Sequence, residues 1–235
     1  MSIAIVQVGA GVSSSGSSLS QAITLAGVTA ADALIAVVGH EDGGSTNPNV
    51  SGSDAQGSYT QDIWVARGNQ ASAGIYSLFN ANAGSHTLTV TASSGTAANS
   101  AWNVNILEVS GLGTTDSFDA SSSNTANTST TPTTGSTGTL AVASEFVITC
   151  AQGNQGSTGG TSPPTGGNNS PFIDIYNATS EWFDSAYQIN TSVTTGVAAA
   201  YGTLNTSVIW AAVIGTYKAF TSIATPTTLM GQILT

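Results

Sequence analysis

The densest group of ionisable side chains in the sequence is the run His40-Glu41-Asp42-Gly43-Gly44. Carboxylates beside flexible glycines supply the oxygen ligands that Ca²⁺ prefers, and Asp54 is the nearest further carboxylate along the chain. The spacing matches no known calcium loop, however, and Asp-Gly is a common turn dipeptide. We therefore interpret the run as a strand end that passes into a solvated loop, and we expect no resident metal or cofactor.

A second pattern, at the start of the chain, is typical of a dinucleotide-binding loop. An apolar stretch leads into Gly9 and Gly11, and Asp32 follows at about the distance of a ribose-binding acid. The third glycine is missing, because Ser14 stands in its place, and the Ser/Gly stretch that follows lacks the period of an amphipathic helix. Without a helix N-terminus to hold a pyrophosphate, the sequence does not predict a nucleotide site.

Hydrolytic chemistry has few candidate residues. His40 and His86 are the only imidazoles, and no G-x-S-x-G nucleophile elbow is present. Two carboxylate pairs, Asp116 with Asp119 and Glu181 with Asp184, have the residue types of a glycosidase acid and base. Carboxylates are by default solvated surface groups, so we predict no catalytic residues and no enzymatic activity.

Aromatic residues offer a further possibility, a stacking platform for sugars. Trp64, Trp102 and Trp210 lie in apolar strand patterns and are expected in the core. Trp182 lies among acidic and aromatic neighbours and is the best candidate for an exposed ring that binds a glycan. Whether a glycan or a calcium ion is bound stays open at this point.

The composition restricts the partners. Only 6% of the 235 residues are charged, and twelve carboxylates stand against Arg67 and Lys218, for a formal net charge of −10. The electrostatic term in nucleic-acid binding would be repulsive, so no direct nucleic-acid partner is expected. The lone Cys150, in an apolar run, is expected to be buried and inert. No signal peptide and no membrane span are predicted, which indicates a product made in the cytoplasm.

Short apolar or alternating runs separated by Gly, Ser, Asn and Pro predict many β-strands and no helix. In His86–Thr91, for example, Leu88 and Val90 fall on one face and hydroxyls on the other. The predicted fold class is all-β, a jelly-roll-like antiparallel β-sandwich. Its strands are expected at 3–8, 21–25, 33–39, 59–67, 74–79, 86–91, 100–110, 140–150, 172–176, 182–189 and 207–219.

A Ser/Thr/Asn/Gly tract from Gly111 to Thr139 divides the chain, and it is expected to be a long connection with at most short edge strands. We predict one sandwich domain over residues 1–218, followed by a C-terminal apolar arm at 219–235. The alternative is two similar halves, 1–112 and 139–218, because their strand chemistry is similar.

Three segments resemble a family of jelly-roll-like β-sandwich structural proteins of tailed bacteriophages and prophages, which includes head decoration, cement and tail-associated proteins. These segments are Leu25–Val37, Ala101–Leu112 and Val208–Tyr217. The chain departs from the family pattern at Ala31, where a glycine usually precedes the aspartate. The resemblance implies a virion protein, made in the host cytoplasm.

The resemblance implies a capsid decoration or cement protein that stabilises the shell by binding across capsid subunits. Its expected partners are the major capsid protein or other virion proteins, and further copies of itself, with a trimer favoured; the alternative is a receptor- or glycan-binding module of a phage tail or fibre. The predicted interface is the apolar arm, because such side chains need a partner surface; the alternative is that the arm folds back onto its own sandwich. Its residues are Phe220, Ile223, Leu229, Met230, Ile233 and Leu234.

Overall fold

The computed structural model describes most of the chain. The described residues are 2–14, 18–41, 49–52, 57–68, 70–92, 101–115, 117–154, 163–166, 171–178, 182–191 and 196–220. None of them lies in a helix, and the strands pair antiparallel throughout. The predicted all-β antiparallel sandwich is confirmed.

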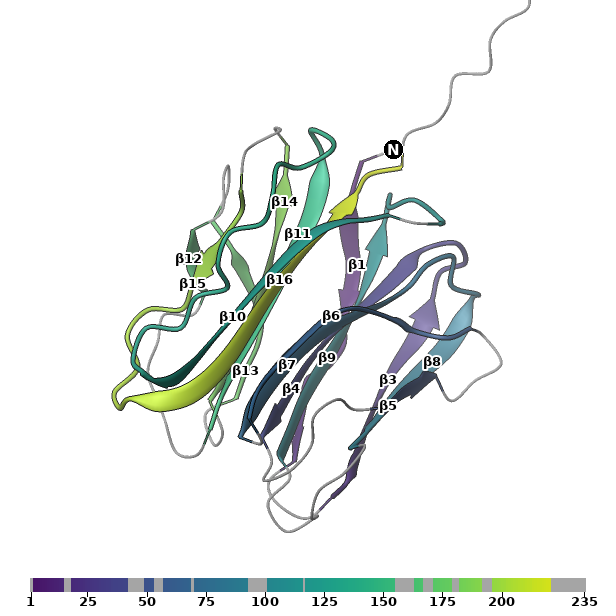
Figure 1. The fold of residues 1–235 in the computed structure, drawn as a ribbon. Helices are drawn as coiled ribbons and strands as arrows, with labels where there is room; N and C mark the ends of the chain where they lie inside the picture. Colours follow the sequence, from purple (N-terminus) through teal and green to yellow (C-terminus); the bar gives the residue numbers. More distant parts are fainter. Residues whose placement is uncertain are drawn as a thin grey trace, which may run out of the picture.

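The first half of the chain forms a six-stranded sheet and a three-stranded sheet (Figure 1). In the large sheet the order is β1-β9-β4-β7-β6, and the short β2 also pairs with β9. The small sheet has the order β3-β8-β5. The bounds are β1 Ala4–Val8, β2 Val12–Ser14, β3 Ser20–Val28, β4 Ala33–Glu41, β5 Asn49–Gly52, β6 Thr60–Arg67, β7 Ala71–Leu78, β8 Gly84–Thr91 and β9 Ala101–Ser110.

The second half forms a five-stranded sheet, of order β10-β16-β11-β14-β13, and a two-stranded sheet of β12 and β15. Backbone hydrogen bonds from Thr134 to Ala199 and from Tyr201 to Pro132 add a third segment beside β15. The bounds are β10 Phe118–Ser129, β11 Glu145–Gly153, β12 Thr165–Gly166, β13 Ile173–Ala178, β14 Phe183–Asn190, β15 Ala199–Ala200 and β16 Val208–Lys218.

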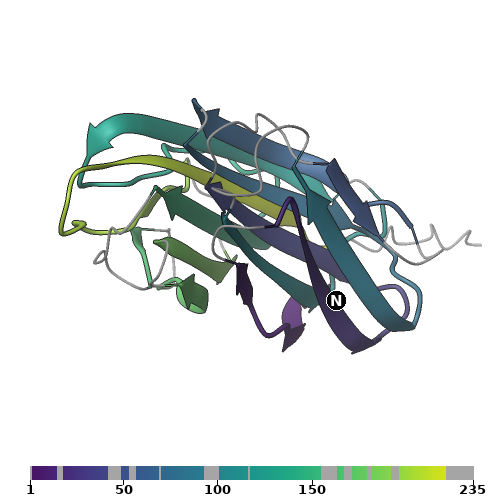
Figure 2. The same cartoon turned by 90° about the horizontal axis from the view of Figure 1, so that it is seen from below.

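The four sheets stack as layers, with the two large sheets face to face in the centre (Figures 1 and 2). Three apolar clusters hold the layers together. The central cluster contains Ile35 and Val37 from β4 and Ile148 and Cys150 from β11, so both halves contribute to it. The outer two clusters join each large sheet to its small covering sheet and the adjoining loops. Because both faces of the central strands are covered, these strands carry apolar residues at nearly every position.

The two halves have the same strand order. In each large sheet the first strand of the half pairs with the last, β1 with β9 and β10 with β16. The next three strands then follow in the same sequence, β4-β7-β6 in the first half and β11-β14-β13 in the second. The small sheets agree as well, since β3-β8-β5 corresponds to the segment at 132–137, β15 and β12. The fold is therefore one arrangement of strands used twice, with the repeats packed face to face.

One sequence prediction about the halves is wrong. The Ser/Thr-rich tract is not a connection with only short edge strands, because it contains β10, a strand of 12 residues. The strand does lie at the edge of its sheet, where it pairs only with β16. One side of an edge strand and much of its outer face meet water, so hydroxyl and amide side chains suffice and Phe118 alone packs as a large apolar residue.

Candidate binding pocket between the two sheets

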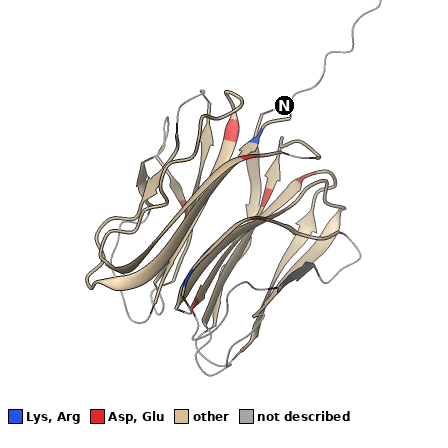
Figure 3. Ribbon diagram, in the orientation of Figure 1, with Lys and Arg blue, Asp and Glu red and all other residues tan. Residues whose placement is uncertain are grey.

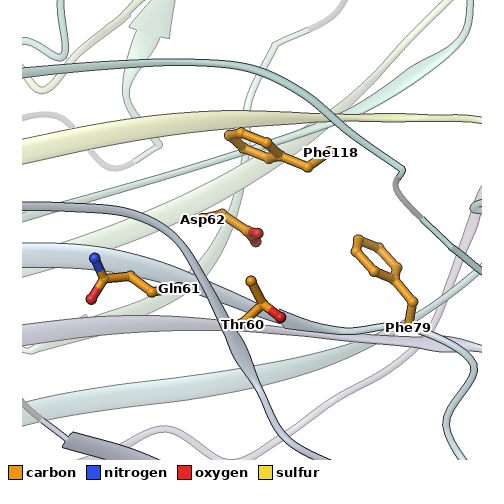
Figure 4. Close-up of a pocket in the computed structure, with 5 residues that line it drawn as sticks. All are labelled: Thr60, Gln61, Asp62, Phe79 and Phe118. Carbon is orange, nitrogen blue, oxygen red and sulfur yellow. The ribbon is translucent and has the colours of Figure 1, made fainter.

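A pocket of about 470 Å³ opens where the edge strand β6 of one large sheet faces the edge strand β10 of the other (Figure 4). Thr60, Gln61, Asp62 and Phe79 line it from the first half and Phe118 lines it from the second. In Figure 4 the carboxylate of Asp62 points toward the space that the two phenylalanine rings border. The pocket thus combines an anionic group with aromatic walls, contributed by both halves.

A β-bulge places Asp62 at this site. The register between β6 and β7 shifts between Gln61 and Ile63, so Asp62 is the extra residue of the bulged strand. A bulge leaves one residue out of the ladder and changes the direction of its side chain. Ile63 resumes normal pairing opposite Ile75 and packs against the central core. The bulge therefore lets a carboxylate enter the space between two sheets without displacing the apolar residues beside it.

Two hydroxyl groups hold the Asp62 carboxylate. Ser77 Oγ donates to Asp62 Oδ1 at 3.1 Å, and Tyr217 OH donates to Oδ2 at 2.5 Å. Burial raises the pKa of Asp62 above its ordinary value, and the hydrogen bonds from Tyr217 and Ser77 oppose that rise because they stabilise the ionised form. Tyr217 itself is fully buried, and burial together with the charge of Asp62 holds the pKa of its phenol far above the usual range. Tyr217 is thus a donor and not a base.

The aromatic walls are fixed by the same tyrosine. The rings of Phe79 and Phe118 contact Tyr217 edge to face, with centroid distances of 6.1 Å and 5.6 Å and interplanar angles of 60° and 64°. Such T-shaped contacts are a favourable arrangement of aromatic quadrupoles. Both phenylalanines are partly exposed and both pack against the central core. The pocket is consequently rigid on the inside and open to solvent at its mouth.

Several other carboxyl groups are buried in the interior. Glu41, Glu108, Glu145 and Asp184 are all at most 6% exposed, and of the described acidic residues, whose positions are red in Figure 3, only Asp174 is exposed. Glu108 accepts hydrogen bonds from the backbone N–H of Thr29 at 2.7 Å and from the side chain of Gln7. This leaves most of the described surface to hydroxyl, amide and small apolar groups.

Glu145 and the partly buried Asp32 lie at equivalent ends of the central strands β11 and β4, each beside another carboxyl group. Burial, with the neighbouring Glu108, raises the pKa of Asp32 to about 6. Burial, with the neighbouring Asp119, raises the pKa of Glu145 to about 7. Lys218 lies 3.9 Å from Asp119 and compensates part of the charge of the second pair. Asp32 and Glu145 thus keep their protons to a higher pH than solvated carboxyl groups do.

Trp182, the best candidate for an exposed ring, is buried. Its ring is 2% exposed and packs at a right angle to Tyr201, with a centroid distance of 5.8 Å, in the cluster under the two-stranded sheet. Trp102 and Trp210 are buried as predicted, and Trp64 is partly buried.

The structure separates the remaining candidates. His40 is buried and stacks on Trp102 with a centroid distance of 3.7 Å, and burial lowers its pKa to about 4. Cys150 is buried, as predicted. Of the predicted arm interface, Phe220 is 42% exposed and its backbone N–H donates to Gly111 O at 2.8 Å. Other candidates lie outside the described residues: Asp42–Gly44, Asp54, Asp116, Glu181, Ile223, Leu229, Met230, Ile233 and Leu234.

The described residues contain neither a metal-binding cluster nor a membrane-spanning helix. No three or more His, Cys, Asp or Glu side chains in these residues gather in a way that would hold a metal ion. The described part of the chain also contains no helix long and apolar enough to cross a membrane.

Asp62 was missed by sequence reasoning, which treated 59–67 as an ordinary strand. A signal was present, since Asp62 interrupts a run that continues with Ile63, Trp64 and Val65. Acidic residues are common at strand ends, so the sequence around Asp62 looks ordinary. Only the bulge distinguishes Asp62 from other acidic residues at strand ends. No family model, curated protein or solved structure matches this chain.

Proposed function

We propose that the chain is a virion structural protein, a capsid decoration or cement protein that acts through its surfaces and interfaces. What supports the proposal most is the uncharged sheet edge at β1. Val6 and Val8 are 47% and 42% exposed there, and β1 contains no charged residue. Soluble proteins usually protect an open edge with lysine, proline, a bulge or a covering segment, and β1 has a bulge at Val6 but neither lysine nor proline. An edge that displays valines instead is suited to pairing with another chain.

A second observation agrees with an assembled state. Ile173, on the edge strand β13 of the other large sheet, is 51% exposed. The interior carboxyl groups reduce the repulsion that a formal charge of −10 would otherwise cause between neighbouring copies. The glycan-binding alternative depended on an exposed Trp182, and the burial of that ring leaves it without its stacking residue.

The test is incorporation into particles. Virions purified from the phage or prophage that encodes the chain are expected to contain it in a fixed ratio to the major capsid protein, accessible to antibody on intact particles. A double variant, Val6→Lys with Val8→Lys, is expected to lower that ratio about tenfold or more, because two buried lysines at a paired edge are strongly unfavourable.

Leu19→Lys is the matched control, since Leu19 is 40% exposed but lies just before β3 and outside the β1 edge. It is expected to leave the ratio unchanged. Absence of the chain from purified virions would refute the proposed function, and normal incorporation of the double variant would refute the role of β1.

A further inference from the structure

The repeated fold supplies an internal comparison for the Asp62 pocket. In the first half Ile5 pairs with Val109, and a register shift follows at once in β1. In the second half Phe118 pairs with Tyr217, and a register shift again follows at once, in β10. The two edge strands β6 and β13 also correspond, because each shifts register after two residues, around Asp62 and around Ile175. The bulge that holds Asp62 therefore has a counterpart that holds Ile175.

Aliphatic residues occupy the counterpart positions of the carboxylate and of the three aromatic residues, whereas Gln61 corresponds to Asp174. Ile175 corresponds to Asp62, Val109 to Tyr217 and Ile5 to Phe118. Phe79, one residue past β7, corresponds in register to Ile189 of β14, which pairs with Phe146 of β11. Val109 belongs to the central core, and the three isoleucines pack against it. Aliphatic side chains thus fill the counterpart of the pocket around Ile175. The fold therefore does not require a carboxylate at Asp62.

The carboxylate oxygens of Asp62 can each accept a further hydrogen bond. Each oxygen of a carboxylate can accept two hydrogen bonds, and the structure gives each Asp62 oxygen one, from Ser77 or from Tyr217. The remaining lone pairs belong to an anionic group beside the faces and edges of two phenylalanine rings. A cation gains both from the carboxylate and from aromatic rings within about 6 Å. A neutral or anionic ligand gains from neither in the same way.

The chain has no cation of its own to spare for this pocket. Its two basic residues are engaged elsewhere, as Arg67 Nε donates to Asn127 Oδ1 and Lys218 lies beside Asp119. We propose that the pocket formed by Asp62, Phe79 and Phe118 binds an alkylammonium or guanidinium group, carried by a lysine or arginine side chain of a neighbouring protein. The binding of an alkylammonium or guanidinium group does not depend on the proposed function. The inference that a neighbouring protein carries this group rests on the proposed function.

The chemistry is tested with small probes. n-Butylammonium is expected to bind the intact chain at millimolar concentration and to shift amide resonances around Asp62, more weakly as salt is added, while n-butanol is expected not to bind there. Asp62→Asn is expected to weaken butylammonium binding about tenfold or more, because it removes a charge-assisted hydrogen bond. Asp174→Asn is the matched control, because Asp174 is an exposed aspartate beside the counterpart bulge.

A second variant removes the carboxylate with a different side-chain shape. Asp62→Ile copies the residue of the counterpart bulge, and it is expected to abolish binding; because it leaves Tyr217 OH without its acceptor, its native chemical-shift pattern away from the pocket is checked before binding is measured. Equal binding of n-butanol and n-butylammonium, or unchanged binding to Asp62→Asn or Asp62→Ile, would overturn the inference. Binding of a neutral disaccharide without butylammonium would also overturn it, in favour of a glycan site.

The source of the cation is tested on particles. Asp62→Asn is expected to lower retention on purified virions, with Asp174→Asn unaffected. If butylammonium binds but the chain is absent from virions, the proposed function fails and the recognition chemistry stands. If the chain is incorporated but butylammonium does not bind, the pocket inference fails and the proposed function stands.

Discussion

Single carboxyl groups make an unusual contribution to stability in this protein. Burial raises the pKa of Asp184 to about 8, with a further rise from Asp174, and the pKa values of Asp32 and Glu145 lie at about 6 and 7. An acid whose folded pKa is raised binds its proton more tightly in the native state than in the unfolded chain. Its contribution is complete below the unfolded pKa and is lost as pH rises through the folded value.

We therefore expect the native state to be less stable at pH 8.5 than near pH 5.5, as measured by urea unfolding at both values. His40 lowers the stability of the native state at acid pH. Its pKa is lowered to about 4 in the folded protein, so its contribution to stability is lost as pH falls below 6.5. Asp184→Asn is expected to reduce the loss between pH 5.5 and 8.5, since the amide cannot ionise. A midpoint that rises toward pH 8.5 would contradict this account.

Residue types alone could not have located these groups. Glu108 and Glu145 stand at the ends of strands, where sequence reasoning places solvated carboxylates, yet both are fully buried. Their burial depends on partners far along the chain, Thr29 for Glu108 and Asp119 for Glu145. The burial of Trp182 could not be located for the same reason, because a layer built from residues near 200 covers the ring. Long-range cover is a property of the fold and leaves no local pattern.

At the scale of elements, the two large sheets approach each other closely at a glycine of β4. A Cβ atom on Gly39 would lie 2.4 Å from both the Phe183 ring and Gln152 Oε1, which belong to β14 and β11. Gln152 Oε1 also accepts a hydrogen bond from Asn103 Nδ2 of β9, at 2.9 Å. Polar and close-packed contacts between the two sheets therefore meet at this point.

Gly39→Ala is expected to destabilise the protein by about 1–3 kcal/mol, because the sheets must separate or Phe183 must leave its rotamer. Gly138→Ala is the control, since a Cβ atom there meets nothing within 4 Å. Urea unfolding of both variants at one pH measures the difference. Equal stability of Gly39→Ala and the wild type would mean that the sheets slide apart readily.

Most strands could be predicted because their apolar residues alternate or run continuously. Strand β9, for instance, carries Trp102 and Val104 on one face and Leu107 and Val109 on the other, and both faces are buried. Strand β10 could not be found, because an edge strand of hydroxyl and amide residues has the composition of a loop. The bulges of β6 and β13 were also invisible, since a bulge is defined by the register of two strands.

At the scale of the whole molecule, the shared central core joins the two repeats. Ile35 of β4 and Ile148 of β11 belong to the same buried cluster and are both fully buried. Neither large sheet can expose its inner face without exposing that of the other. The similarity between the halves that strand chemistry suggested extends in the structure to strand order and bulge position, which no single-sequence comparison could have established.

We expect the described sandwich to unfold in one cooperative transition. Ile35→Ala and Ile148→Ala are each expected to destabilise that same transition by about 2–5 kcal/mol, because each leaves a cavity in the common core. Circular dichroism and tryptophan fluorescence should report coincident midpoints. Two separate transitions, with each substitution moving only one of them, would show that the repeats unfold independently.

The position of Cys150 has a practical consequence for following that event. Its thiol lies in the central core, 3.6 Å from the carbonyl oxygen of Gly74 on the facing sheet, and burial raises its pKa to about 12. A thiol that is neither ionised nor accessible does not react with alkylating reagents. Because it is the only cysteine, its rate of alkylation measures how often the two repeats part, and the protein carries its own reporter of that opening without an engineered label.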